Sequence, residues 1–149
     1  TGTGFFALPA GRIVGPEGRV YAVDLSPEML EDLQSKLGRE PRSNVEAIRS
    51  TEDRIPLSDA SVDFAFLACV LHELDGPGTL LECRRILVPT GRLGVVDWKK
   101  EEMEFGPPKA HRLDLDQARA ILGDAGFRPT RTFEAGRYHY GIEARIRRA

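Results

Sequence analysis

Short apolar segments alternate with longer segments of helical period along this chain of 149 residues, and this alternation limits the folds open to it. The short segments are rich in β-branched and aromatic residues, as buried strands are. The longer segments carry Leu, Ile or Met at helical spacing. Strands that alternate with helices predict an α/β domain with a mainly parallel sheet. The expected strands cover residues 19–25, 44–50, 61–71 and 92–98, and the expected helices lie within 26–38, 76–91 and 113–127.

Local signals mark the ends of several elements. Ser26 is placed to cap the first of these helices, and Gly38 is placed to end it. Residues 61–71 form a continuous apolar run, which is typical of a parallel strand with both faces covered. Near the C-terminus, residues 128–136 and 137–148 predict two strands around a short turn. Because no crossover helix fits between them, we expect the last strand to run antiparallel.

The length of the chain predicts one domain over residues 1–149, and its charge argues against binding of nucleic acid. The formal net charge of -2 is too close to zero for broad attraction to nucleic acid or to an anionic membrane. No apolar run approaches the ~20 residues of a membrane span, and no signal peptide is visible. Cys69 and Cys83 show no metal or redox spacing, so we expect a cytoplasmic protein with reduced thiols and no bound metal.

The chain begins with a glycine-rich segment, in which GTGFFA matches the dinucleotide-binding pattern G-x-G-x-x-[GA]. Asp24 follows about 20 residues later, at the end of an expected strand, where an acidic side chain holds ribose hydroxyls. Glycines let the backbone approach a ligand, and the N-terminus of the helix that follows favours negative charge. Taken alone, these residues suit NAD as well as any other cofactor.

A longer set of motifs resembles the class I S-adenosylmethionine-dependent methyltransferases. The opening loop and RVYAVDLSPEML resemble the family's first glycine motif and the acidic end of its second strand. RSTEDRIPLSDASVDFAF resembles its adenine-contacting turn and the start of strand four. VLHELDGPGTLLECRRILVPTGRL resembles the segment from the His after strand four to the turn before strand five. This ordered match covers nearly the whole chain and is nearest to the enzymes of ubiquinone and menaquinone biosynthesis.

The resemblance implies a Rossmann-like, doubly wound α/β fold whose mainly parallel sheet ends in an antiparallel hairpin. In the family, the glycine loop follows a first strand, and Gly2 and Gly4 correspond to the last two glycines of that motif. The first strand is missing from this chain. We therefore expect the native protein to be longer, with an N-terminal strand and helix that are absent here.

The resemblance also implies S-adenosylmethionine as the cofactor. Asp24 is expected to accept hydrogen bonds from both ribose hydroxyls, and Leu25 to pack on the adenine. Relatives often carry an Asp where this chain has Ser50, so its neighbours Thr51 and Glu52 are expected to supply partners for the adenine. The expected cofactor residues are Gly2, Thr3, Gly4, Asp24, Leu25, Ser50, Thr51, Glu52 and Cys69.

Candidate acceptor residues follow the later strands, at the sheet edge where ligands bind in such folds. His72 is expected to act as a catalytic base or substrate contact, the alternative being a structural His that caps the next turn. Trp98 is expected either to line a pocket or to pack over the hydrophobic core. Residues 99–112 predict a long loop, in which Met103 and Phe105 suit an apolar contact that opens and closes. We expect these groups to hold a small, partly apolar acceptor.

Two other functions remain open at this point. A nicotinamide-dependent oxidoreductase is compatible with the glycine loop, although no second substrate domain and no catalytic Tyr-Lys pair is evident. A non-catalytic cofactor-binding domain is compatible with the missing first strand. Binding of S-adenosylmethionine, S-adenosylhomocysteine and NAD, measured in parallel, separates these hypotheses.

Overall fold

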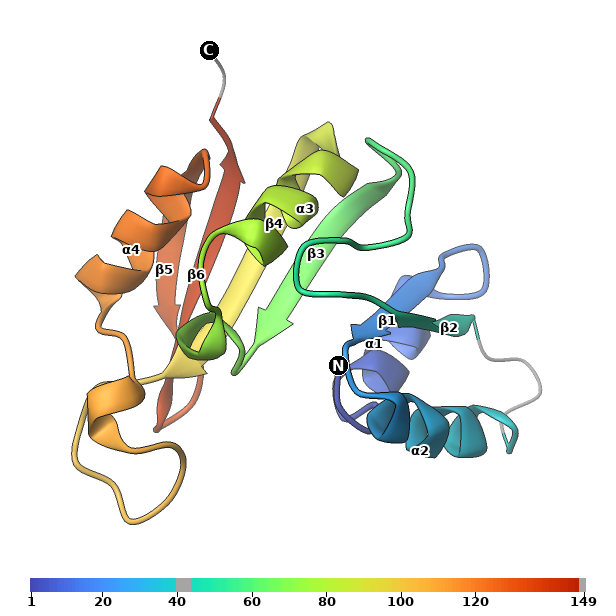
Figure 1. Cartoon of the computed structure of the whole chain (residues 1–149), viewed down its shortest axis with the longest axis horizontal. Coiled ribbons are helices and arrows are strands. Elements are labelled where there is room, and N and C mark those ends of the chain that lie inside the picture. The colour runs from blue at the N-terminus through green and yellow to red at the C-terminus, as the bar shows by residue number, and fades with distance from the viewer. Residues whose placement is uncertain (40–43, 148–149) are drawn as a thin grey trace. The chain divides into compact units, whose positions relative to one another are not determined.

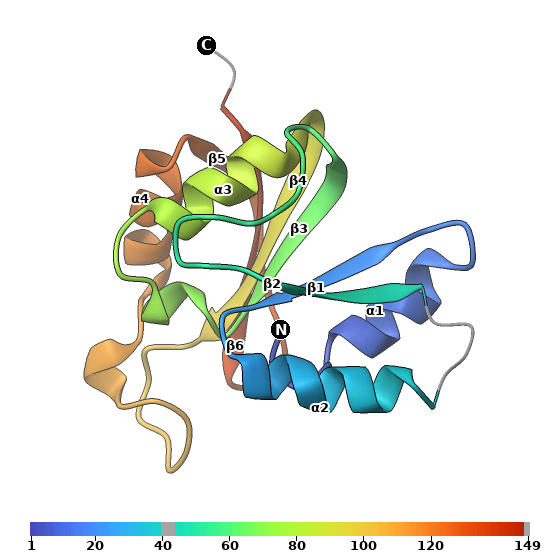
Figure 2. The ribbon, with the colours of Figure 1, turned by 45° about the vertical axis from the view of Figure 1, so that its right-hand side comes forward.

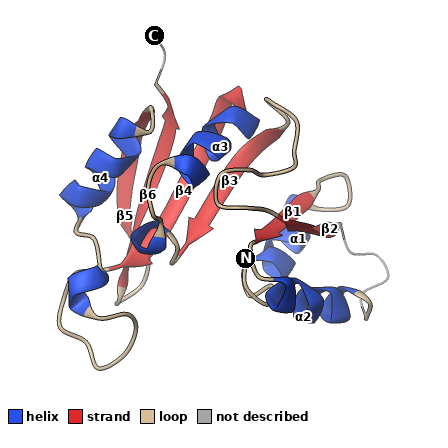
Figure 3. Ribbon diagram, in the orientation of Figure 1, coloured by secondary structure: helices blue, strands red, loops and turns tan. Residues whose placement is uncertain are grey.

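The computed structural model describes residues 1–39 and 44–147, which fall into two compact units (Figures 1 and 3). The first unit is Thr1–Pro56 and the second is Leu57–Ala149. Helices and strands alternate in both units, and the second ends in an antiparallel pair of strands. The predicted α/β class is therefore confirmed. None of the helices in the described ranges is long and apolar enough to cross a lipid bilayer.

The first unit packs two helices against a parallel pair of strands (Figure 2). Its core consists of four buried side chains, one from each element, so the helices hold the pair together. The elements are α1 (Ala7–Val14), β1 (Val20–Asp24), α2 (Pro27–Leu37) and β2 (Val45–Arg49). The core residues are Ala7, Ala22, Leu33 and Val45. Among residues 1–39 no strand precedes α1.

Helix α2 begins and ends where the local signals predicted. The hydroxyl of Ser26 accepts a hydrogen bond from the backbone N–H of Met29, and Pro27 occupies the first helical position. Gly38 follows the last helical residue. This helix lies between β1 and β2 in the chain, as a parallel connection requires.

The second unit is a four-stranded sheet in the order β3-β4-β6-β5. Strand β3 runs parallel to β4, and β6 runs antiparallel to both of its neighbours, β4 and β5. The predicted antiparallel ending is confirmed, with β6 on the inner side of the hairpin. The elements are β3 (Val62–Ala68), η1 (Leu71–Glu73), α3 (Gly78–Ile86), β4 (Leu87–Trp98), η2 (Lys109–His111), α4 (Leu115–Asp124), β5 (Phe127–Glu134) and β6 (His139–Ile146).

Two expectations for this sheet were wrong. Strand β4 starts at Leu87, five residues before the expected 92–98, because the Pro-Thr-Gly segment forms an irregularity within the strand and does not precede it. The expectation that both faces of β3 are covered also fails: Phe64 is 51% exposed and Phe66 is 43% exposed. Figure 1 shows α3 and α4 over one face of the sheet. The two rings lie next to Gly94 of β4.

Candidate active site

The glycine loop of the first unit has a backbone conformation that favours glycine. Gly2 and Gly4 have φ values of 54° and 92°, in the left-handed region. A Cβ atom on Gly4 would lie 2.6 Å from Cδ1 of the buried Leu33, whereas one on Gly2 would meet no atom within 4 Å. Lys36 of α2 donates a hydrogen bond to the carbonyl of Thr3 at 2.9 Å. The loop is therefore anchored on α2 and leaves open space beside Gly2.

Asp24, at the end of β1, joins this loop to the strand. Its Oδ2 atom accepts hydrogen bonds from the Thr1 amino group at 2.8 Å and from the N–H of Gly2 at 2.7 Å. Its Oδ1 atom accepts one from the N–H of Ser26 at 3.0 Å. Burial opposes ionisation of the carboxyl group, whereas the hydrogen bonds from the N–H groups of Ser26 and Gly2 favour it and act to lower the pKa of Asp24. Asp24 is thus an ionised acceptor beside the glycine loop.

The remaining cofactor candidates of the first unit lie at the same ends of β1 and β2. The side chain of Leu25 is 49% exposed and presents an apolar surface next to Asp24. The N–H of Ser50 bonds to the carbonyl of Asp24 at 3.0 Å. Thr51 donates its N–H to the carbonyl of Arg54 at 3.0 Å and so closes a turn that contains Glu52. The structure therefore gathers the loop, the carboxylate, the apolar side chain and the turn.

In the second unit, Cys69 follows β3 in a strained conformation. Its φ of 54° is uncommon for a residue with a side chain, and such strain gathers at functional sites. Its N–H bonds to the carbonyl of Val96 at 2.8 Å, which keeps the end of β3 next to β4. Burial and the negative charges of Asp97 and Glu73 raise the pKa of the Cys69 thiol to about 11. The thiol is therefore neutral at physiological pH.

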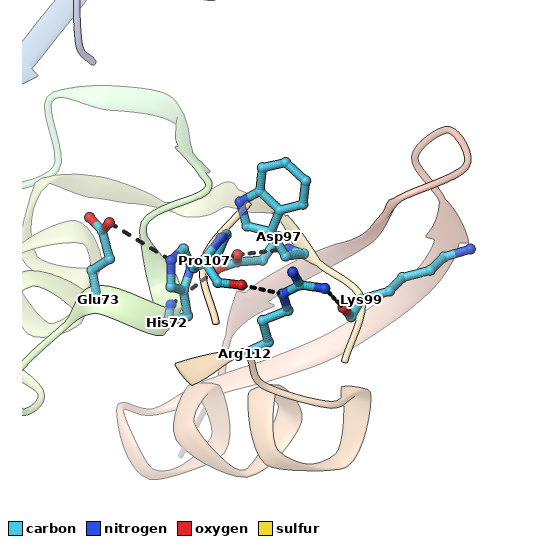
Figure 4. Close-up of polar contacts among 7 residues, drawn as sticks. His72, Glu73, Asp97, Lys99, Pro107 and Arg112 are labelled. Atoms are coloured by element: carbon cyan, nitrogen blue, oxygen red, sulfur yellow. Dashed lines mark hydrogen bonds and ion pairs between the residues drawn. The ribbon is translucent and has the colours of Figure 1, made fainter. Parts of the chain in front are cut away.

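His72 lies in the short helix η1 and is bound by Asp97 of β4 (Figure 4). Its Nδ1 atom lies 2.7 Å from Oδ1 of Asp97, and its backbone N–H donates to Oδ2 at 3.1 Å. The carboxylate of Asp97 holds the ring by Nδ1, so Nε2 is the ring nitrogen that faces away from Asp97. Nε2 lies 3.8 Å from Oε1 of Glu73, whose side chain is exposed. The geometry suits a proton acceptor, although the His72 side chain is only 4% exposed.

Asp97 is buried, and the protein satisfies its carboxylate from two segments. Besides the two bonds from His72, Oδ1 accepts the N–H of Trp98 at 2.8 Å. Tyr140 pairs with Asp97 across β4 and β6, and its buried hydroxyl has no hydrogen-bond partner within the described part of the chain. Burial, followed by the charges of Asp97 and Asp114, raises the pKa of Tyr140. Its hydroxyl is therefore a neutral group.

Trp98 and Phe105 belong to a group of aromatic rings beyond the end of β4. The Trp98 ring lies 6.1 Å from Phe105 and 4.2 Å from His139, and Phe105 lies 4.7 Å from Tyr138, measured between ring centroids. Successive side chains of a strand point to opposite faces, so Trp98 and Asp97 leave β4 on different sides. The structure thus joins Trp98 to Phe105, as expected, but not to the side of β4 that binds His72.

Two residues with clear roles were missing from the predicted site. Asp97 lies within the expected strand 92–98 but was not predicted as a site residue, although a single acid within the apolar run GVVDW is itself a signal of a buried, paired carboxylate. Arg112, which organises the 99–112 loop, gives no such signal, because a charged residue at the end of a loop is ordinary. Within the described ranges, no cluster of three or more His, Cys, Asp or Glu side chains is arranged to hold a metal ion.

Comparison with known proteins shows the family of this chain. The model of a family described as "Methyltransferase domain" matches residues 1–95. The chain is 27% identical over 138 residues to the arsenite methyltransferase of Halobacterium salinarum, covering 85% of this chain and 35% of that protein. It is 31% identical over 106 residues to the ubiquinone/menaquinone biosynthesis C-methyltransferase of a Marinomonas species, covering 70% and 42% respectively. The chain thus spans less than half the length of both of these relatives.

A solved structure is similar over almost the whole chain. A S-adenosylmethionine-dependent methyltransferase from Aquifex aeolicus matches with a TM-score of 0.93 and 39% sequence identity. The match covers 98% of this chain and 78% of the other. This likeness confirms the Rossmann-like fold predicted from the motifs.

Proposed function

Since this chain belongs to the S-adenosylmethionine-dependent methyltransferase domain family, we propose that it binds S-adenosylmethionine and transfers the methyl group to a small, partly apolar acceptor. One observation supports this proposal above all: the N–H of Gly2 in the glycine loop donates a hydrogen bond to Asp24 at 2.7 Å. The bond places the carboxylate beside a glycine loop that is anchored on α2 and has open space at Gly2. These are the features that an adenosine cofactor with a charged amino-acid end requires.

The residues of the first unit fit this cofactor. Asp24 lies beside the glycine loop with 18% of its side chain exposed, which suits the proposed hydrogen bonds from both ribose hydroxyls. The open space beside Gly2 admits the methionine end. Leu25 offers an exposed apolar surface for the adenine, and the turn at Ser50 and Thr51 offers backbone groups.

The bound cofactor would supply an activated methyl group whose sulfur leaves as a neutral thioether, so the chain need not assist the leaving group. Its task is to hold the acceptor in line with the methyl carbon and to keep water out. Where the attacking atom of the acceptor carries a proton, we assign the Nε2 atom of His72 as the group that takes it. Asp97 holds the ring by Nδ1, and the exposed Glu73 beside Nε2 passes the proton on to solvent.

The aromatic group beyond β4 lies on the side of the strand opposite His72, so we propose that it contacts a part of the acceptor remote from the attacking atom. Phe105 is 47% exposed and stands next to the partly buried rings of Trp98 and Tyr138. Such a surface favours an acceptor with an apolar or aromatic portion. The almost neutral chain offers no broad attraction for nucleic acid.

Thermal unfolding in the presence of ligands tests the cofactor assignment. A ligand at 100 times its Kd stabilises the folded protein by about 2.7 kcal/mol. We expect S-adenosylmethionine and S-adenosylhomocysteine to raise Tm, and NAD at the same concentration to leave it unchanged. A shift with NAD alone would refute the proposal. Product masses from a panel of phenols, amines, thiols and quinones then identify the acceptor, and a protein that binds the cofactor but methylates nothing in the panel would favour a non-catalytic domain.

A further inference from the structure

Arg112 is a buried cation at the end of the 99–112 loop. The residue is only 3% exposed. Among the described contacts, its guanidinium group makes no hydrogen bond to another side chain. Instead it donates hydrogen bonds to the backbone carbonyls of the loop that surrounds it. These are the carbonyls of Pro107 at 2.8 Å, Lys99 at 3.4 Å, Glu101 at 2.8 Å and Phe105 at 3.0 Å.

These four bonds join both ends of the loop to its middle. Figure 4 shows the guanidinium group of Arg112 between Lys99, at the start of the loop, and Pro107, past its middle. Arginine suits this place because its planar group presents five N–H donors in fixed directions. Lysine has three donors on one flexible ammonium group and does not reach four separated carbonyls. The loop is therefore built around one side chain.

The same side chain supports the aromatic group defined by Trp98, Phe105, Tyr138 and His139. The guanidinium carbon lies 5.9 Å from the centroid of the Trp98 ring, within the range of a cation-π contact. Gly106, with φ of 84°, passes so close to this ring that a Cβ atom would lie 3.1 Å from it. The Trp98 ring therefore contacts both the loop backbone and Arg112.

We propose that Arg112 is a positioning residue that holds the 99–112 loop as a fixed aromatic wall for the methyl acceptor. The identity of the ligand in this inference rests on the proposed function. The claim that the loop is fixed does not depend on it. It differs from the sequence expectation of an apolar contact that opens and closes. A loop that is already ordered loses less conformational entropy when the acceptor binds. Arg112 therefore contributes to acceptor affinity and not to cofactor affinity.

Arg112→Lys tests the proposal, with Arg119→Lys on the exposed side of α4 as the matched control. Trp98 is the only tryptophan of the chain, so its fluorescence reports on the loop alone. We expect Arg112→Lys to raise the acrylamide quenching constant of Trp98 about threefold and to speed trypsin cleavage after Lys100 and Lys109 at least tenfold. The control is expected to change neither. Unchanged quenching and cleavage in folded Arg112→Lys would overturn the proposal.

The wild-type protein provides a test that does not depend on a variant's folding. Trypsin is expected to cut after Lys100 and Lys109 more slowly than after Arg137, in the exposed turn between β5 and β6. Faster cleavage in the loop than in that turn would show that the loop is not fixed, and would overturn the proposal.

Enzyme kinetics separate this role from a general loss of structure. With an acceptor from the panel, Arg112→Lys is expected to raise KM for the acceptor about tenfold while the Kd for S-adenosylmethionine stays within about twofold. A loss of cofactor affinity equal to the loss of acceptor affinity would refute a positioning role. If the wild-type protein fails to bind S-adenosylmethionine, the proposed function fails, whereas quenching and proteolysis still decide the state of the loop.

Discussion

The Oδ1 atom of Asp97 lies 2.7 Å from Nδ1 of His72, and both side chains are almost completely buried. The contact joins the segment after β3 to the end of β4, and the carboxylate also accepts two backbone N–H groups. A buried carboxylate satisfied in this way orients the imidazole and, at the same time, connects two elements of the sheet. Its removal should therefore affect both stability and the proposed chemistry.

Asp97→Ala is expected to lower the free energy of unfolding by about 3–5 kcal/mol, because it leaves buried polar groups of His72 and Trp98 without their acceptor. Urea denaturation measures the change. Asp75→Ala, at an exposed position of the same unit, is the control and should change stability by less than about 0.5 kcal/mol. Equal effects of the two substitutions would show that the Asp97 contacts contribute little.

Asp24→Ala is expected to weaken S-adenosylmethionine binding about 10- to 100-fold, since a hydrogen bond to a charged group contributes roughly 1.5–3 kcal/mol. Part of this loss comes through the glycine loop, because the same carboxylate holds the N–H of Gly2. Calorimetric titration gives the two dissociation constants, and Glu31→Ala on the exposed side of α2 is the control. Unchanged affinity in Asp24→Ala would remove this residue from the cofactor site.

Gly4→Ala is expected to lower the free energy of unfolding by about 2–3 kcal/mol, through its left-handed backbone and the close approach of Leu33. Gly2→Ala shares the left-handed backbone but meets no neighbouring atom, so it should cost only about 1 kcal/mol. Denaturation curves of the two variants isolate the steric contribution. If Gly2→Ala destabilises the protein as much as Gly4→Ala, backbone strain alone accounts for both.

Cys69 is expected to react slowly with iodoacetamide at pH 7, because burial and the charges of Asp97 and Glu73 raise its pKa to about 11. Since the thiolate is the reactive form, the rate should rise about tenfold per pH unit between pH 7 and about 10. Cys83 is buried with its pKa raised to about 12 and serves as the internal reference. Mass spectrometry follows each site. A rate that levels off below pH 9 would contradict the raised pKa.

Short-range features of this protein were predictable from its sequence, because their causes lie within a few residues. Ser26 caps α2 through the N–H three residues later, and Asp114 with Gln117 forms a capping box at the start of α4. The position of Asp24 at the end of a strand follows from the apolar run before it. The apolar run 92–98 likewise placed Trp98 at the end of a strand, whereas the expected strand 61–71 ends at Ala68, just before Cys69.

The sequence by itself determined the α/β class, the order of the elements and the candidate residues at strand ends, because hydrophobic period and capping act locally. Only the tertiary structure decided which of those residues meet. The bond from His72 to Asp97 and the four bonds from Arg112 join groups brought together by the sheet and by the closure of a loop. The exposure of Phe64 was also decided there, because an apolar side chain in a strand is buried only where another element covers that face.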